Sequence, residues 1–282
     1  MLDIPVPLFA SVESKLEGIE RGICSKIATI CRDLSHDHVG SVTITPLTSK
    51  STSIGPRPKP ADADVKHIWK EGLFRLFLSH ASAHKVAVAK LKTELQFCGI
   101  SAFLAHEDIT PSSEWQNEIE LALRSMHALA ALLTPDFHDS NWTDQEVGFA
   151  LGKGVLVVPV RLGSDPYGFI GKVQGLSGSS DQPVRLAGLL FATLFNHAST
   201  HRNMRKGVAA AFESANSYAN AIALSEVIST IKDFSDDEKA VIQRACKNND
   251  HVIKAIGVVA RVCSAIGVPD PSKADEADDV PF

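Results

Sequence analysis

The sequence predicts an α/β fold: a parallel sheet with helices on both faces, preceded by an N-terminal helix and followed by a helical region. Short apolar runs alternate with helical patterns from residue 73 to residue 160, which is typical of a parallel sheet with right-handed crossovers. The run Ala128–Thr134 is apolar almost throughout, as expected of a strand buried on both faces. From about Gln182 the pattern is helical almost to Gly267.

The first 60 residues are expected to hold an amphipathic helix and a proline-rich linker. Apolar side chains recur at steps of three and four across residues 12–34, and Ser11 is available as an N-cap. A short strand is expected over Val42–Thr45. Three alternating prolines make Gly55–Pro60 a stiff, extended linker, so we place a domain boundary there. We interpret the helix as packing on the main domain or on its own copy in a dimer.

The central segment, residues 70–180, is expected to form the α/β domain. Gly99 follows one predicted helix at the C′ position, where a glycine often ends a helix. Ser112 or Ser113 can cap the next predicted helix, which includes Trp115. The predicted strands and helices are, in chain order, Leu73–Ser79, a helix over Ser82–Cys98, Ile100–Ala105, a helix carrying Ile119, Ala122, Leu123 and Met126, Ala128–Thr134, a helix over Trp142–Leu151, and Val155–Val160.

Residues 181–268 are expected to form a C-terminal helical region. Ser235 and Glu238 match a capping box, with the serine as N-cap and the glutamate three residues later. Residues 269–282 are rich in acidic residues, so we expect a disordered acidic tail.

Composition excludes several functional classes. The 28 basic and 33 acidic residues give a net charge of −5, and no basic cluster stands out, so nucleic acid is not an expected partner. The longest apolar runs are far shorter than the roughly 20 residues of a membrane span. The N-terminus lacks the features of a signal peptide, and we therefore expect a cytoplasmic protein. The histidines and cysteines show no metal-ligand spacing, so no metal is expected.

Two common functions of parallel α/β domains are also excluded by their motifs. No GxGxxG follows the first predicted strand, and no GxxxxGK[ST] occurs anywhere, which argues against nucleotide-phosphate binding of those two kinds. A response-regulator receiver needs acidic residues at the end of its first strand to hold Mg²⁺, whereas this strand ends in Ser79 and His80.

Three motifs resemble those of the TIR domain, and they occur in the family's order and spacing over roughly residues 73–178. The run FLSHAS at 77–82 resembles the first strand and the loop after it, and FLAHEDITP at 103–111 resembles the second strand and its loop. The run SNWTDQE at 140–146 resembles the third signature, and Val158–Val160 matches the strand that follows. Ala105 departs from the family, in which many members carry an aspartate. The resemblance is greatest to the bacterial, NAD-cleaving branch, and it implies a flavodoxin-like sheet.

In that branch the glutamate of the third motif cleaves NAD⁺ between nicotinamide and ribose, and the matching residue is Glu146. Trp142 lies four residues earlier, on the same face of the predicted helix. A carboxylate can stabilise an oxocarbenium-like ribose, and an indole ring can stack on the pyridinium with on the order of 1–2 kcal/mol. The resemblance also places four residues in the substrate site: Ser79, His80, Ser82 and Glu107.

Two functions from different classes follow. The first is an NAD⁺ glycohydrolase or cyclase, a hydrolase of N-glycosyl bonds that yields nicotinamide and linear or cyclic ADP-ribose, with NAD⁺ as substrate and no cofactor. The resemblance implies a role in antiviral (antiphage) defence and immune signalling, activation by assembly into an oligomer through TIR–TIR contacts, and a phage-derived or protein trigger. The alternative is a non-catalytic TIR–TIR interaction or scaffold module.

Overall fold

The computed structural model describes residues 2–32, 41–47, 60–104 and 115–271, and it divides the chain into two compact units, Met1–Pro58 and Lys59–Phe282. The first unit begins with a parallel pair of short strands, in which Leu2 lies opposite Ile44. The backbone N–H of Ile44 also donates to Oε1 of Glu20 at 2.7 Å, which ties the second strand to the long helix. The elements of this first unit are β1 (Leu2–Pro5), α1 (Val6–Val12), the 3-10 helix η1 (Glu13–Lys15), α2 (Leu16–Arg32) and β2 (Ile44–Leu47).

The helix expected over 12–34 is therefore divided in the structure. A 3-10 turn, η1, separates α2 from the shorter α1, and the N-cap position of this turn is Val12 rather than Ser11. The hydroxyl of Ser11 instead donates to the carbonyl oxygen of Leu8 at 2.6 Å, a bond back into the preceding turn. The strand expected over Val42–Thr45 begins two residues later.

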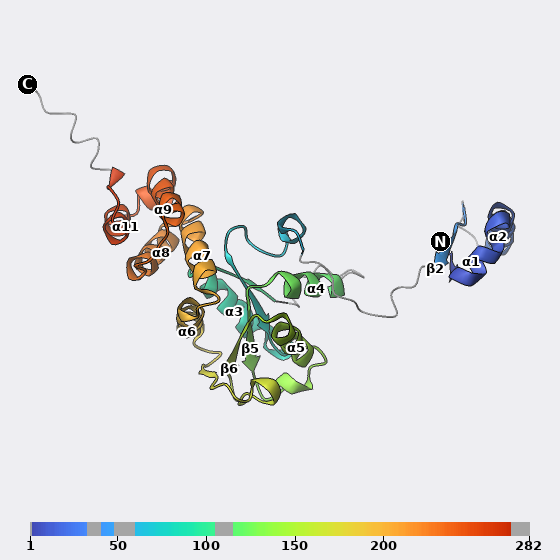
Figure 1. The fold of residues 1–282 in the computed structure, drawn as a ribbon, viewed down its shortest axis with the longest axis horizontal. Helices are drawn as coiled ribbons and strands as arrows, with labels where there is room; N and C mark the ends of the chain where they lie inside the picture. The colour runs from blue at the N-terminus through green and yellow to red at the C-terminus, as the bar shows by residue number, and fades with distance from the viewer. Residues whose placement is uncertain (1, 33–40, 48–59, 105–114, 272–282) are drawn as a thin grey trace, which may run out of the picture. The chain divides into compact units, whose positions relative to one another are not determined.

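The second unit contains a parallel sheet with strand order β4-β3-β5-β6-β7, which confirms the predicted flavodoxin-like architecture (Figure 1). The first four strands of this unit fall where the apolar runs predicted them. The fifth was not predicted, because its two residues are too few to show a periodicity. The strands are β3 (Phe74–Ser79), β4 (Ile100–Phe103), β5 (Ala128–Leu133), β6 (Leu156–Arg161) and β7 (Leu176–Ser177).

The central strand β5 is buried along its whole length and contributes to a core on each face of the sheet. Leu129, Ala131 and Leu133 face the first core, and the alternate residues Ala130 and Leu132 face the second, as the two-residue period of a strand requires. Helices α4 (Trp115–Ser125) and α5 (Thr143–Lys153) cover the first core; α3 (Lys85–Gln96) and α6 (Pro183–Asn196) cover the second (Figure 1).

Helix α6 belongs to the α/β layer, although it lies beyond residue 180, where the sequence suggested a boundary. Its buried residues Leu186, Leu190 and Leu194 pack in the same core as α3 and the sheet. Beyond it, α7 and the following helices share a separate apolar core, which also contains Leu73. These helices are α7 (His201–Glu213), α8 (Tyr218–Thr230), α9 (Asp236–Asn248), α10 (Asp250–Ile253) and α11 (Val258–Ile266).

Helix α7 packs closely against the amino ends of β3 and β4. A Cβ atom on Gly207 would lie 2.5 Å from the carbonyl oxygen of Gly99 and 2.9 Å from the backbone nitrogen of Phe74, so only glycine fits. Gly99 itself has φ +76°, a left-handed conformation that suits the turn after α3. The helical region is thus joined to the amino edge of the sheet, at the opposite end from Ser79.

The capping box expected at the start of α9 is present. The backbone N–H of Ser235 donates to Oε2 of Glu238 at 2.9 Å, and the N–H of Glu238 donates to the serine hydroxyl at 3.4 Å. The acidic tail expected over 269–282 falls almost entirely outside the described residues. Among the helices that are described, none is long and apolar enough to cross a membrane.

Candidate active site

The carboxyl ends of β3 and β5 bring together two residues of the expected site. Ser79 is the last residue of β3, and it lies opposite Ala131 of β5, on the side of the sheet that α5 covers. After β5, a short 3-10 helix, η4 (Phe137–Asp139), leads into α5. The buried hydroxyl of Thr143 donates to the carbonyl oxygen of Phe137 at 2.5 Å, which fixes the point at which α5 begins. The first turn of α5 carries Glu146.

Glu146 is buried and hydrogen-bonded to Ser79. The serine hydroxyl donates to Oε2 of the glutamate at 2.5 Å, and the two residues are 0% and 4% exposed. Carboxylates are almost never fully buried without a partner, because an ionised group loses its hydration. This acid therefore occupies a position that packing alone does not favour.

Burial raises the pKa of the Glu146 carboxyl group from 4.5 to about 7, while the hydrogen bond from Ser79 acts in the opposite direction and favours the ionised form. The group consequently changes charge near neutral pH. A strongly shifted acid at the carboxyl edge of a parallel sheet is a candidate functional group, because ligand crevices form at this edge.

Trp142 lies one helical turn before Glu146, as the sequence spacing predicted. It occupies the N-cap position of α5, and its carbonyl oxygen accepts the backbone N–H of Glu146 at 2.9 Å. The residue is partly exposed, whereas Glu146 is buried. The structure thus joins an accessible aromatic residue and a buried acid within the first turn of one helix.

His80 follows Ser79 in the chain but faces the other side of the sheet. Its Nδ1 lies 3.0 Å from the carbonyl oxygen of Leu78, and its ring lines a pocket with apolar residues of the second core. The residues around this pocket include Val88 and Leu91 of α3, Leu132 of β5 and Leu186 of α6. The sequence grouped Ser79 and His80 in one site; the structure separates their side chains across the sheet.

The other two residues expected in the substrate site are placed differently. Ser82 is exposed on the turn after β3, as the first residue of the 3-10 helix η3 (Ser82–His84). Glu107 lies outside the described residues. Within the described part of the chain, no group of three or more histidine, cysteine, aspartate or glutamate side chains is arranged to hold a metal ion.

A cluster beside the site was not anticipated from the sequence. The hydroxyl of Tyr167 donates to Oδ1 of Asp144 at 2.5 Å, and Nδ1 of His138 lies 2.6 Å from Oδ2 of the same carboxylate. Burial and the nearby Asp144 both raise the pKa of Tyr167. The cluster ties the loops that follow β5 and β6 to the first turn of α5. The only signal in the sequence was an aromatic residue in a glycine-rich loop.

The family comparison agrees with this architecture. The family model described as "TIR domain" matches residues 76–190, which run from β3 into α6 and include Ser79, Trp142 and Glu146. A solved structure that matches is the TIR domain of the Toll-related receptor TRR-2 from Hydra magnipapillata, with 22% identity over 47% of this chain and 98% of that chain, and a TM-score of 0.36. None of the curated proteins compared with the chain matches it. Residues 76–190 of this chain therefore constitute a TIR domain.

Proposed function

We propose that this TIR domain cleaves the bond between nicotinamide and ribose in NAD⁺, with Glu146 as the catalytic residue. The observation that carries the proposal is the buried carboxyl group of Glu146, bonded to Ser79 at the carboxyl edge of the sheet and titrating near pH 7. A buried acid of this kind is unfavourable for folding and is therefore expected where chemistry requires it.

The proposed reaction uses the positive charge of the substrate. When the bond between C1′ of the ribose and the ring nitrogen breaks, its electron pair stays on nicotinamide, which leaves as a neutral molecule. The ribose becomes oxocarbenium-like, and the carboxylate of Glu146 stabilises its positive charge. The cationic substrate also favours the ionised form of Glu146 when it binds. Water then adds to C1′ and releases a proton to give ADP-ribose, or a nitrogen of the adenine adds to give the cyclic product.

Trp142 is proposed to hold the nicotinamide. Its place one turn before Glu146 allows the indole ring to stack on the pyridinium, a contact on the order of 1–2 kcal/mol once water is excluded. Ser82 and Glu107 are proposed to contact the rest of the nucleotide. His80 was expected in the same site, but its buried ring faces the second core, so we do not propose it as a contact.

The biological setting is a proposal that rests on the resemblance of the three motifs to bacterial TIR proteins. We infer a cytoplasmic enzyme that acts in antiphage defence, that is activated when TIR domains assemble, and that responds to a phage-derived or protein trigger. The N-terminal helix and the helices after α6 lie outside the domain that carries Glu146, and so they are suited to assembly.

Chromatography of the products formed from NAD⁺ tests the function. Concentrated or assembled wild-type protein is expected to release nicotinamide, and Glu146→Gln is expected to abolish the release. Glu71→Gln is the matched control, because Glu71 is exposed and precedes β3 at the amino edge of the sheet. Assembled wild-type protein that releases no nicotinamide would instead indicate the non-catalytic interaction module.

A further inference from the structure

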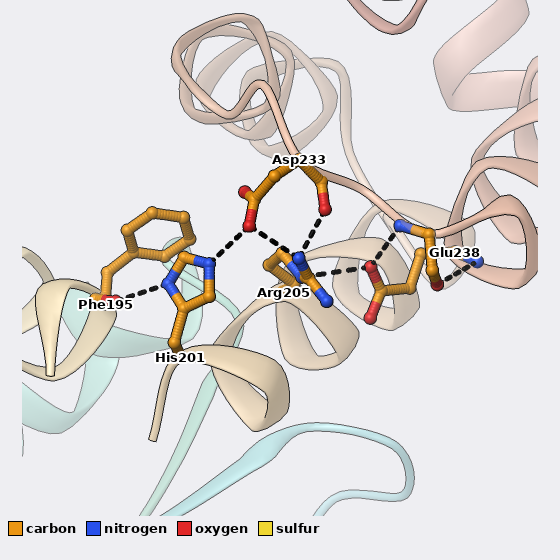
Figure 2. Close-up of polar contacts among 6 residues, drawn as sticks. Phe195, His201, Arg205, Asp233 and Glu238 are labelled. Atoms are coloured by element: carbon orange, nitrogen blue, oxygen red, sulfur yellow. Dashed lines mark hydrogen bonds and ion pairs between the residues drawn. The ribbon is translucent and has the colours of Figure 1, made fainter. Parts of the chain in front are cut away.

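His201 joins three segments of the chain (Figure 2). It is the first residue of α7, and its Nδ1 lies 2.6 Å from the carbonyl oxygen of Phe195, near the end of α6. Its Nε2 lies 2.7 Å from Oδ2 of Asp233, in the segment between α8 and α9. The ring of Phe195 packs edge-on against the imidazole, with 4.5 Å between the ring centroids. One side chain therefore connects the last helix on the sheet to the loop that leads into α9.

Both ring nitrogens of His201 face groups that only accept hydrogen bonds. A carbonyl oxygen and a carboxylate oxygen each require an N–H, and a neutral imidazole has one N–H whereas the imidazolium has two. The two distances are therefore satisfied together only when the ring carries both protons. These two distances alone assign the charged form to His201, before the neighbouring charges are considered.

The surrounding charges agree with this assignment. Arg205, one turn along α7, donates to Oδ2 of Asp233 at 2.6 Å and also to its carbonyl oxygen. Its Nε lies 3.2 Å from Oε2 of Glu238, the buried acid of the α9 capping box. Protonated His201 and Arg205 thus balance the two carboxylates, and loss of one proton leaves an excess negative charge. From α6, His201 meets the carbonyl oxygen and the ring of Phe195.

We propose that protonated His201 is a latch that holds the segment between α8 and α9 against the end of α6, and that loss of its proton loosens this attachment. Without the second N–H, either the carbonyl of Phe195 or the carboxylate of Asp233 loses its donor. Because Asp233 also holds Arg205, and Arg205 faces Glu238, the effect reaches the start of α9. The packing of the helical region on the TIR domain would then depend on pH.

The direction of this dependence follows from proton linkage. The hydrogen bonds that the ring of His201 donates to the carboxylate of Asp233 and to the carbonyl oxygen of Phe195 raise the pKa of His201 above its ordinary value of about 6.5. A folded-state pKa above the unfolded value means that the stabilisation is complete below about pH 6.5 and is lost as pH rises through the folded value. Above the folded-state pKa of His201, the opening constant of the latch is larger by about tenfold for each unit by which this pKa exceeds the unfolded-state pKa.

Amide hydrogen exchange in the full chain tests the latch. Opening constants for the backbone amides of α8 and α9, corrected for intrinsic exchange, should rise between pH 6 and pH 9 in the wild type. In His201→Gln the opening constants of the same amides should already be high at pH 6, and they should stay constant up to pH 9. His197→Gln is the matched control, because His197 lies four residues earlier and its ring bonds the nearby Ser199; it should keep the wild-type pH dependence. Equal pH profiles in wild type and His201→Gln would overturn the proposal.

An NMR titration keeps the test decisive if His201→Gln does not fold. The imidazole signals of His201 in the wild-type chain should titrate at higher pH than those of His201 in Asp233→Asn, which removes the charge of its partner. An identical midpoint in the two proteins would show that Asp233 does not hold the proton, and the latch would be rejected.

Discussion

Ser79 and Glu146 lie 67 residues apart in the chain, and the hydroxyl of the first donates to the carboxyl group of the second at 2.5 Å, with both residues buried. The end of β3 and the first turn of α5 are thereby joined through an acid that burial keeps partly protonated at neutral pH. Burial therefore places the pKa of the proposed catalytic group near 7, and the hydrogen bond from Ser79 keeps it from rising further.

Replacing the acid should stabilise the fold at alkaline pH. The pKa of Glu146 is about 7 in the folded protein and near 4.5 when exposed, so the native state binds more protons than the unfolded state between these values. Wild-type stability should therefore fall as pH rises from about 4.5 to about 7 and should change little at higher pH. Glu146→Gln, which cannot ionise, should be more stable than the wild type at pH 8.5, by up to on the order of 3 kcal/mol. Urea unfolding at pH 5 and pH 8.5 measures the change; a stability difference that is the same at both values would contradict it.

The proposed reaction should require the ionised form of Glu146. We expect kcat/KM for nicotinamide release to rise with pH through about 7, since this parameter reports the free enzyme. Rates measured between pH 5.5 and pH 9 at low NAD⁺ concentration provide the profile. A kcat/KM that falls over the same range would mean that the protonated acid is the active form, and the proposed role of the carboxylate would have to be abandoned.

Ser79 should act through Glu146, as a positioning residue. Its hydrogen bond favours the carboxylate, so Ser79→Ala should raise the pKa of Glu146 further and move the kcat/KM profile to higher pH. Loss of the bond also leaves a buried carboxyl oxygen without this donor, at a cost of about 1–3 kcal/mol in stability. A purely structural role would lower the rate equally at every pH. The pH at which kcat/KM rises in Ser79→Ala therefore distinguishes the positioning role from the structural one.

Trp142 should contribute to binding through the face of its ring. Trp142→Ala is expected to reduce kcat/KM roughly tenfold, which corresponds to the 1–2 kcal/mol of a desolvated contact between a cation and an aromatic ring. Trp142→Phe keeps an aromatic face and should retain most of the activity. The contact would be disproved if the two variants lost the same activity, because the defect would then come from the altered start of α5.

The sequence predicted four of the five strands of the sheet because each is a mainly apolar run between helical patterns. Ala128–Leu133, for example, is buried on both faces and needs no partner to be recognised as a strand. The spacing of Trp142 and Glu146 was also visible, since both lie in one helical turn. The bond between Ser79 and Glu146 could not be predicted from the sequence, because it depends on how β3, β5 and α5 are placed in space. Strand alternation could have indicated that His80 faces away from Ser79.

The bond between Tyr167 and Asp144, beside the site, could not be predicted for another reason. Tyr167 belongs to a loop after β6, where no hydrophobic period exists to show which neighbour it meets. The attachment of the helical region was equally hidden, because Gly207 lies within a helical pattern and its contact with Gly99 spans more than a hundred residues of chain. Long-range contacts of this kind follow from the packed fold and carry no local signature.

The close contact between Gly207 and Gly99 joins the helical region to the sheet. Gly207→Ala should weaken the packing of α7 on the amino edge of the sheet, because its Cβ would lie 2.5 Å from the carbonyl oxygen of Gly99. Overpacking at a rigid backbone contact costs about 1–3 kcal/mol. Gly188→Ala is the matched control, since this exposed glycine of α6 has no neighbouring atom within 4 Å of the new Cβ. It should leave stability unchanged or raise it by up to about 1 kcal/mol.

Thermal and urea unfolding of the two glycine variants measure the difference. Because Gly207 lies at the amino edge and Glu146 at the carboxyl edge, the folded fraction of Gly207→Ala should keep the wild-type pH profile of nicotinamide release. Equal stability of Gly207→Ala and Gly188→Ala would show that α7 can shift away from Gly99 without cost, and that the close approach of the two glycines does not hold the helical region in place.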